Sequence, residues 1–234
     1  MLVCRHTSLL IQQVRRTAQN QGAEQSSESR FTYIAETHTV SDEIYELVIE
    51  SGPSLKQVKI TYGGRRALRY ALNAIRGMVK RQTWQDGVQY EYPRFALRGI
   101  IEGFYGQPWS QEQRLDMLQF IASHGMNTYI YGPKDDAYHR ERWRDLYDTE
   151  SFQRLAEVIS KACELGLDFY YCIAPGLSMR YSSEEDYRTL IRKIEQMYEM
   201  GVRHFGLLLD DIPEKLQHPE DIATYPDLVT AHVH

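Results

Sequence analysis

The sequence is poor in cysteine, has no long apolar run and carries no excess of positive charge. Its three cysteines, Cys4, Cys163 and Cys172, lack metal-type spacing, and their odd number does not indicate a disulfide framework, which favours a reducing compartment. No stretch of the sequence approaches the roughly 20 apolar residues of a membrane span. The first residues also lack the apolar core of a signal peptide. These absences predict a cytoplasmic protein that does not enter a membrane.

Charge and glycine spacing argue against two further classes. The formal net charge of -5 and the pI near 5.9 leave no basic surface, so nucleic acid is not an expected partner. Gly63 and Gly64 lack the glycine spacing of either nucleotide fingerprint, and we interpret them as a connection between a strand and a helix. With 42% hydrophobic residues among 234, the chain can form one large or two modest globular domains.

Residues 1–92 predict a small α/β domain with an incomplete sheet. Apolar residues at helical spacing indicate a helix between Leu9 and Ala18. Residues 45–49 and 58–62 have the composition of strands, with a Gly-Pro turn signal between them. The segment after Gly64 is expected to be helical, because five apolar residues recur on one face: Leu68, Ala71, Leu72, Ile75 and Met78.

Residues 93–234 alternate between strand and helix patterns. Two helix starts are indicated by capping-box spacing, Ser110 with Gln113 and Ser182 with Glu185. Glycines follow three helices, at the position where a left-handed residue is needed: Gly125, Gly166 and Gly201. The expected order is strand 95–102, helix 110–124, strand 127–131, helix 149–165, strand 167–173, helix 183–200 and strand 204–209.

This alternation predicts parallel βαβ units and fits two architectures. Four strands can form the first half, about four βα units, of a TIM (β/α)8 barrel, since a complete barrel needs eight strands and about 250 residues. An open doubly wound sheet fits the same periodicity. In both, the loops that follow the strands gather at one edge of the sheet, where α/β proteins place their sites.

Asp210 and Asp211 follow the last expected strand and are the first candidates for a catalytic site. Neighbouring carboxylates repel, so such a pair must share a proton or gain a cation. The alternative is structural, because aspartate often caps a helix or begins a turn, and residues 212–214 have the composition of a turn into a helix. The dipeptide alone does not decide between the two.

The loops after the other strands are rich in aromatic, glycine and charged residues. Aromatic faces suit the C–H side of a sugar ring and charged groups suit its hydroxyls, so this composition favours a carbohydrate ligand. His139 and His204 are interpreted as structural, since neither has a second metal ligand at suitable spacing. Five aromatic residues are candidates for the rim of the site: Tyr105, Trp109, Tyr131, Tyr138 and Trp143.

Four blocks, 98–109, 127–140, 174–176 and 209–212, closely resemble family 84 glycoside hydrolases in order and spacing. These are β-N-acetylglucosaminidases, and they include protein O-GlcNAcases and bacterial enzymes called hyaluronidases. Residues 40–92 more weakly resemble the small α/β domain that precedes the barrel in bacterial members. The resemblance implies the (β/α)8 barrel and a β-linked N-acetylglucosamine glycan or glycoconjugate as the partner.

The resemblance also implies a retaining, substrate-assisted mechanism, in which the acetamido oxygen of the substrate attacks the anomeric carbon and forms an oxazoline. Asp210 would orient the acetamido N–H, and Asp211 would act as general acid and then as general base. Gly103 and Lys134 match positions that contact sugar hydroxyls. No metal and no other cofactor is implied.

Other interpretations stay open. Lys134 can instead pair with Asp135 or Asp136, and both of these can be structural. The four aspartates at positions 135, 136, 210 and 211 can together hold a hard cation in a metal-dependent hydrolase. We expect the chain to be the N-terminal part of a longer enzyme. Such a part can self-associate through its exposed sheet edges or serve as a non-catalytic carbohydrate-binding protein.

Overall fold

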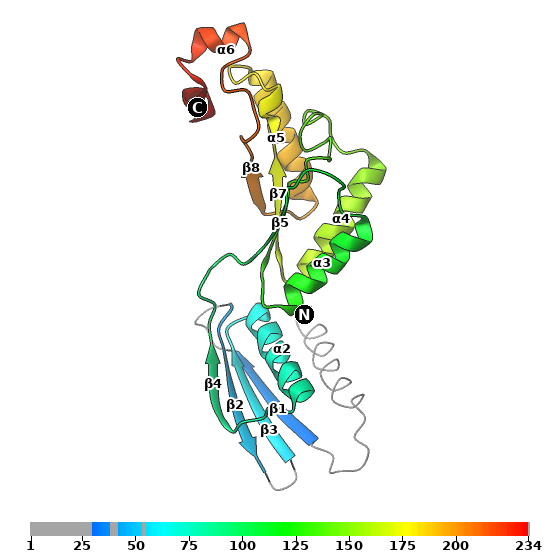
Figure 1. The fold of residues 1–234 in the computed structure, drawn as a ribbon, viewed down its shortest axis with the longest axis vertical. Helices are drawn as coiled ribbons and strands as arrows, with labels where there is room; N and C mark the ends of the chain where they lie inside the picture. Colours follow the sequence, from blue (N-terminus) through cyan, green and yellow to red (C-terminus); the bar gives the residue numbers. More distant parts are fainter. Residues whose placement is uncertain (1–29, 38–41, 53–54, 234) are drawn as a thin grey trace. The chain divides into compact units, whose positions relative to one another are not determined.

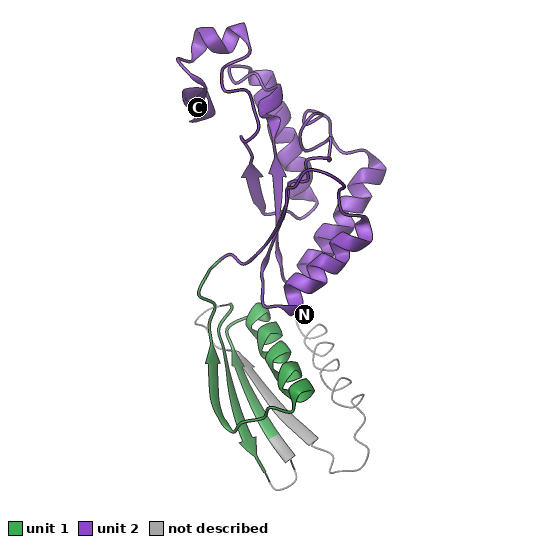
Figure 2. Cartoon of the chain, viewed as in Figure 1, with its two compact units in different colours: residues 1–96 green, residues 97–234 purple. Residues whose placement is uncertain are grey.

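The structure is a computed structural model that describes residues 30–37, 42–52 and 55–233. The chain divides into two compact units, residues 1–96 and 97–234 (Figure 2). Each unit contains its own sheet and its own hydrophobic core. The helix predicted between Leu9 and Ala18 lies outside the described residues.

The first unit contains a four-stranded sheet in the order β1-β3-β2-β4 (Figure 1). β1 runs parallel to β3, whereas β2 is antiparallel to both β3 and β4. Helix α2 (Arg65–Arg81) packs on this sheet, and the five apolar residues predicted to share its face are all buried. The strands are β1 (Arg30–Thr37), β2 (Tyr45–Ser51), β3 (Leu55–Tyr62) and β4 (Gly87–Glu91).

The second unit contains a four-stranded parallel sheet in the order β5-β6-β7-β8. This order confirms the prediction of parallel βαβ units. The strands are β5 (Gly99–Glu102), β6 (Thr128–Tyr131), β7 (Asp168–Ile173) and β8 (His204–Leu207). The helices are α3 (Gln111–Ser123), α4 (Thr149–Glu164), the short 3-10 helix η1 (Pro175–Leu177), α5 (Glu184–Glu199), α6 (Pro219–Thr224) and α7 (Leu228–Val233).

Helices α3, α4 and α5 contribute to a core on one face of the parallel sheet. Tyr129, Tyr171 and Trp143 are fully buried in that core. The opposite face is more open, since 62% of the Ile101 surface is exposed. Within the described residues, no helix combines the length and the apolar character that crossing a membrane would require.

Local signals place most helix ends correctly. Ser110 and Gln113 form the predicted capping box at the start of α3. The three predicted glycines have positive φ values, 73° at Gly125, 67° at Gly166 and 106° at Gly201. These are conformations that other residues adopt only with strain.

Helix α5 corrects the prediction at its start, because its cap is Ser183, one residue after the predicted Ser182. The side chain of Ser183 accepts a hydrogen bond from the Asp186 N–H at 3.3 Å. Ser182 is engaged elsewhere, since its N–H and its hydroxyl donate to Asp221 Oδ1 at 2.7 and 2.6 Å. The tertiary contact with Asp221 therefore decides which of the two adjacent serines caps α5.

All four strands of the second unit are shorter than predicted, β6 and β7 by one residue at the start, and β5 and β8 by more. The paired register of β5 begins at Gly99, opposite Thr128, the first residue of β6, and residues 95–98 precede the strand. β7 ends at Ile173, opposite Leu207, so residues 208–209 continue beyond the end of their neighbour. The aspartate pair consequently lies in a loop rather than at the last position of a strand.

Candidate active site

Three charged side chains meet beyond the strand ends of the second unit. Lys134, in the loop after β6, has its Nζ 2.8 Å from Asp210 Oδ2 and 3.4 Å from Asp211 Oδ2. The lysine is only 8% exposed, whereas the side chains of Asp210 and Asp211 are 57% and 50% exposed. The structure therefore pairs Lys134 with the two candidate catalytic aspartates, and the alternative pairing with Asp135 or Asp136 is wrong.

The aspartate pair does not cap a helix. Helix α6 begins at Pro219, with His218 as its cap residue, so the expected turn from residues 212–214 directly into a helix is wrong. Residues 211 and 212 instead form a bend that leaves both carboxylates open to solvent. The helix-cap alternative for the pair is thereby removed, whereas the alternative that the pair begins a turn stays open.

The backbone around Asp211 is held in an uncommon conformation. Asp211 has a φ of 52°, in the left-handed region, and its carbonyl oxygen accepts a hydrogen bond from Arg140 Nη2 at 3.1 Å. Gly176, in the loop after β7, lies so close to Ile212 that an added Cβ would be 2.7 Å from Ile212 Cγ2. Loops from three strands thus fix the direction of the Asp211 side chain.

The loop after β5 also reaches the pair. The hydroxyl of Tyr105 donates to Asp211 Oδ2 at 2.6 Å, and the Lys134 Nζ lies 5.5 Å from the centre of the same ring. Gly103 is at the start of this loop, where an added Cβ would be 3.1 Å from Ile101 Cγ2. Tyr105 is therefore the rim aromatic that contacts the candidate catalytic groups.

The hydrogen bonds shift the pKa values of the cluster. The hydrogen bond from Lys134 lowers the pKa of Asp210. Hydrogen bonds from Tyr105 and then from Lys134 lower the pKa of Asp211. Burial, the largest single effect, would lower the pKa of Lys134, but the hydrogen bonds to Asp210 and Asp211 together with the charge of Asp210 raise it. Neighbouring carboxylates can share a proton or gain a cation, and the structure shows the second arrangement, with Lys134 as the cation.

Asp135 and Asp136 do not join the cluster. Asp136 accepts hydrogen bonds from the hydroxyls of Tyr131 at 2.8 Å and Tyr147 at 2.6 Å, and from the Tyr138 N–H at 2.9 Å. It is therefore structural. Among the residues that the structure describes, no group of three or more His, Cys, Asp or Glu side chains is arranged to hold a metal ion. The geometry gives no support to a cation held by all four aspartates.

The other predicted rim aromatics divide between core and cavity. Trp143 is fully buried in the core and Tyr131 is 5% exposed, so neither presents a face to the aspartate pair. Trp109 packs edge-on against Phe104, with ring centres 5.2 Å apart. Trp109, Tyr138 and one edge of the buried Tyr131 line a separate cavity.

Both histidines have structural contacts, as interpreted from the sequence. His139 is fully buried, and its Nδ1 lies 2.7 Å from the carbonyl oxygen of Cys172. Burial lowers its pKa, which favours the neutral ring. His204 Nε2 lies 3.5 Å from Asp168 Oδ1, and its ring stacks on Tyr170 with centres 4.6 Å apart.

Sequence reasoning missed a buried ion pair that supports the loop after β5. Glu102 is fully buried and accepts hydrogen bonds from Arg114 Nε at 3.0 Å, from Arg114 Nη2 at 2.8 Å and from the Tyr129 hydroxyl. Arg114 lies on α3 and Tyr129 on β6. The carboxylate therefore ties the end of β5 to two other elements, directly before Gly103.

The cluster leads to a prediction for Lys134→Met, which removes the cation. We expect the pKa of Asp210 and of Asp211 to rise, so that both carboxylates lose their charge at a higher pH than in the native chain. Carbon NMR titration of the aspartate carboxyl groups measures both values. Lys161→Met is the control, because Lys161 pairs with Glu164 at 3.2 Å on α4. Unchanged titrations of Asp210 and Asp211 in Lys134→Met would contradict the electrostatic role of this lysine.

Comparisons with known proteins agree with this fold. The profile of the beta-N-acetylglucosaminidase family, NAGidase, matches residues 98–234, more than half of the chain. The protein O-GlcNAcases of Rattus norvegicus and Mus musculus are each 42% identical over 123 residues, which is 53% of this chain and 13% of theirs.

Two solved structures are similar as well. A mutant of the Thermobaculum terrenum O-GlcNAc hydrolase is 50% identical, with a TM-score of 0.58 over 59% of this chain and 30% of that one. The structure of CpGH84B is 30% identical, with a TM-score of 0.70 over 89% of this chain and 39% of that one. The chain thus spans less than half the length of each of these relatives.

The parallel α/β sheet with acidic groups beyond its strand ends fits part of an α/β barrel of the glycoside hydrolase class. Within that class, the chain belongs to family 84, the β-N-acetylglucosaminidases.

Proposed function

We propose that this chain carries catalytic residues of an enzyme that removes β-linked N-acetylglucosamine with retention of configuration. The observation that carries the proposal is the cluster of Lys134, Asp210 and Asp211 beyond the strand ends. Family membership and the O-GlcNAcase names of the relatives indicate the sugar. In the proposal, strands β5 to β8 form the first half of a (β/α)8 barrel.

Asp210 is assigned to the acetamido group of the substrate. Its carboxylate accepts the acetamido N–H and aligns the acetamido oxygen with the anomeric carbon, where an oxazoline forms as the leaving group departs. It also stabilises the positive charge that develops on the acetamido group. The lowered pKa of Asp210 supports this role, because the group must stay ionised throughout.

Asp211 is assigned to proton transfer. It protonates the leaving oxygen and later removes a proton from the water that opens the oxazoline. In the free protein, Tyr105 and Lys134 favour the anion. A sugar that displaces the Tyr105 hydroxyl and covers Asp211 would raise the pKa of the carboxyl toward that of a general acid. Lys134 and the backbone of Gly103 bind the sugar hydroxyls.

A comparison of two substrates tests the mechanism. We expect the chain to release 4-nitrophenol from the aryl N-acetyl-β-glucosaminide and not from the aryl β-glucoside, which lacks the acetamido nucleophile. Absorbance of 4-nitrophenolate measures both rates. Equal hydrolysis of the two substrates would contradict substrate assistance. Binding of N-acetylglucosamine without release would instead favour the non-catalytic carbohydrate-binding alternative.

A further inference from the structure

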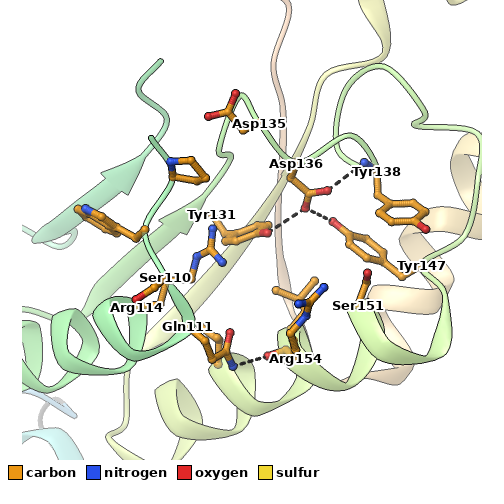
Figure 3. A pocket seen from close by; sticks show the side chains of 14 residues that line it. Ser110, Gln111, Arg114, Tyr131, Asp135, Asp136, Tyr138, Tyr147, Ser151 and Arg154 are labelled. Atoms are coloured by element: carbon orange, nitrogen blue, oxygen red, sulfur yellow. Dashed lines mark hydrogen bonds between the residues drawn. The ribbon is translucent and has the colours of Figure 1, made fainter. Parts of the chain in front are cut away.

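A cavity of about 330 Å³ lies on the helix side of the parallel sheet, beside the first turns of α3 and α4 (Figure 3). Neither Asp210 nor Asp211 lines it. We propose that this cavity is a second, non-catalytic binding site for a pyranose ring of the glycan. The inference rests on the proposed function for its substrate class, but it concerns a different place in the unit.

Hydrogen bonds hold three of the aromatic residues that line the cavity, Tyr131, Tyr138 and Tyr147. The hydroxyls of Tyr131 and Tyr147 both donate to Asp136, which lies between them in Figure 3. The hydroxyl of Tyr138 donates to Asp148 Oδ2 at 2.8 Å, and its ring centre is 4.7 Å from that of Tyr147. Tyr131 and Tyr147 are only 5% and 7% exposed, so the rings on which a sugar can pack its C–H face are those of Trp109 and Tyr138, which are partly exposed.

Polar groups surround these aromatic residues. The side-chain nitrogen of Gln111 donates hydrogen bonds to the Arg154 carbonyl oxygen at 2.9 Å and to Glu157 Oε2 at 2.8 Å, which hold the amide in place. Five lining residues can hydrogen-bond sugar hydroxyls: Asp135 through its carboxylate, Gln111 through its amide, Arg154 through its guanidinium, and Ser110 and Ser151 through their hydroxyls. An apolar wall with a few convergent polar groups is the usual composition of a small-molecule site.

Charge and size favour a neutral sugar over an anion. Two arginines, Arg114 and Arg154, and two aspartates, Asp135 and Asp136, line the cavity, so their formal charges cancel. Arg114 is in addition paired with the buried Glu102 at 2.8 Å. A volume of about 330 Å³ lies at the lower end of ligand pockets, near 300 Å³, which suits one ring rather than a long chain.

Tryptophan fluorescence can report binding here directly. The chain has three tryptophans, and Trp109 lines the cavity. Trp143 is fully buried, and Trp84 packs in the core of the first unit. We expect the β1,4-linked disaccharide of N-acetylglucosamine to cause a saturable change in fluorescence. The change should persist in Lys134→Met, which alters the catalytic cluster, and should disappear in Trp109→Phe.

Matched variants of α4 then locate the ligand. Ser151→Phe places a ring in the cavity and is expected to weaken binding at least tenfold, whereas Ser160→Phe, at an exposed position of the same helix, leaves it unchanged. Asp135→Ala removes a polar group without filling space and should weaken binding several-fold. Circular dichroism checks that each variant folds.

Three results would overturn the proposal: no saturable change, full affinity in Ser151→Phe, or loss of the signal in Lys134→Met. None depends on turnover, so a failed hydrolysis assay leaves this test intact.

Discussion

Asp211→Asn is expected to lower kcat/KM by about 10²- to 10⁴-fold for an N-acetylglucosaminide with a poor leaving group, because an amide cannot donate the proton that the departing oxygen needs. With a good leaving group, such as 2,4-dinitrophenolate, bond cleavage needs little protonation, and the loss should be much smaller. A series of aryl N-acetyl-β-glucosaminides with leaving groups of graded acidity measures this dependence.

Asp210→Asn is the matched control, since it removes the same charge one residue earlier. Its effect on kcat/KM should be large and similar for all leaving groups, because the proposed partner of Asp210 is the acetamido group and not the departing oxygen. Both side chains are at least half exposed, so neither change should disturb the fold. A loss in Asp211→Asn that does not vary with the leaving group would contradict its role as general acid.

Helices α2 to α5 and their order could be predicted because their signals are local, whereas α6 and α7 were not predicted. Ser110 and Gln113 lie three residues apart, and Gly125, Gly166 and Gly201 each act within one turn of a helix end. β4 gave no comparable signal: it is a short edge strand with mostly exposed residues, so it lacks a buried apolar pattern. Its pairing with β2 depends on the rest of the sheet.

The candidate site was predictable in outline but not in its contacts. Parallel strands bring their following loops to one edge, which is why residues as distant as Lys134 and Asp210 could be expected near each other. The sequence could not tell which aspartates Lys134 would contact. That choice depends on the bend at Asp211 and on the engagement of Asp136 by tyrosine hydroxyls, both of which are tertiary features.

The buried ion pair of Glu102 and Arg114 could not be predicted from the sequence either, because it too depends on tertiary structure. Glu102 precedes the loop that carries Tyr105, and Tyr105 donates to Asp211. The carboxylate is fully buried and the Arg114 side chain is 17% exposed. Such a pair is weak evidence for net stability, yet breaking it is costly because one charge remains without its partner.

We therefore expect Glu102→Gln to destabilise the second unit by about 3 kcal/mol, at the low end of the usual range because Arg114 keeps some contact with water. The change keeps the shape of the side chain but leaves the guanidinium without an anion. Hydrogen–deuterium exchange of the amides in β5 to β8 measures the loss for this unit alone. Faster exchange near Gly103 should accompany a weaker contact between Tyr105 and Asp211.

Tyr129→Phe is the control for Glu102→Gln, because it removes one hydrogen bond to the same carboxylate and keeps the ion pair. It should cost about 1.5–3 kcal/mol, the usual value for a hydrogen bond to a charged group. The double variant Glu102→Gln with Arg114→Met should be less destabilised than the sum of its single changes, since no unpaired charge remains. If the losses in Glu102→Gln and Arg114→Met simply add up in the double variant, charge pairing does not hold the loop after β5. Packing around Glu102 would then hold it.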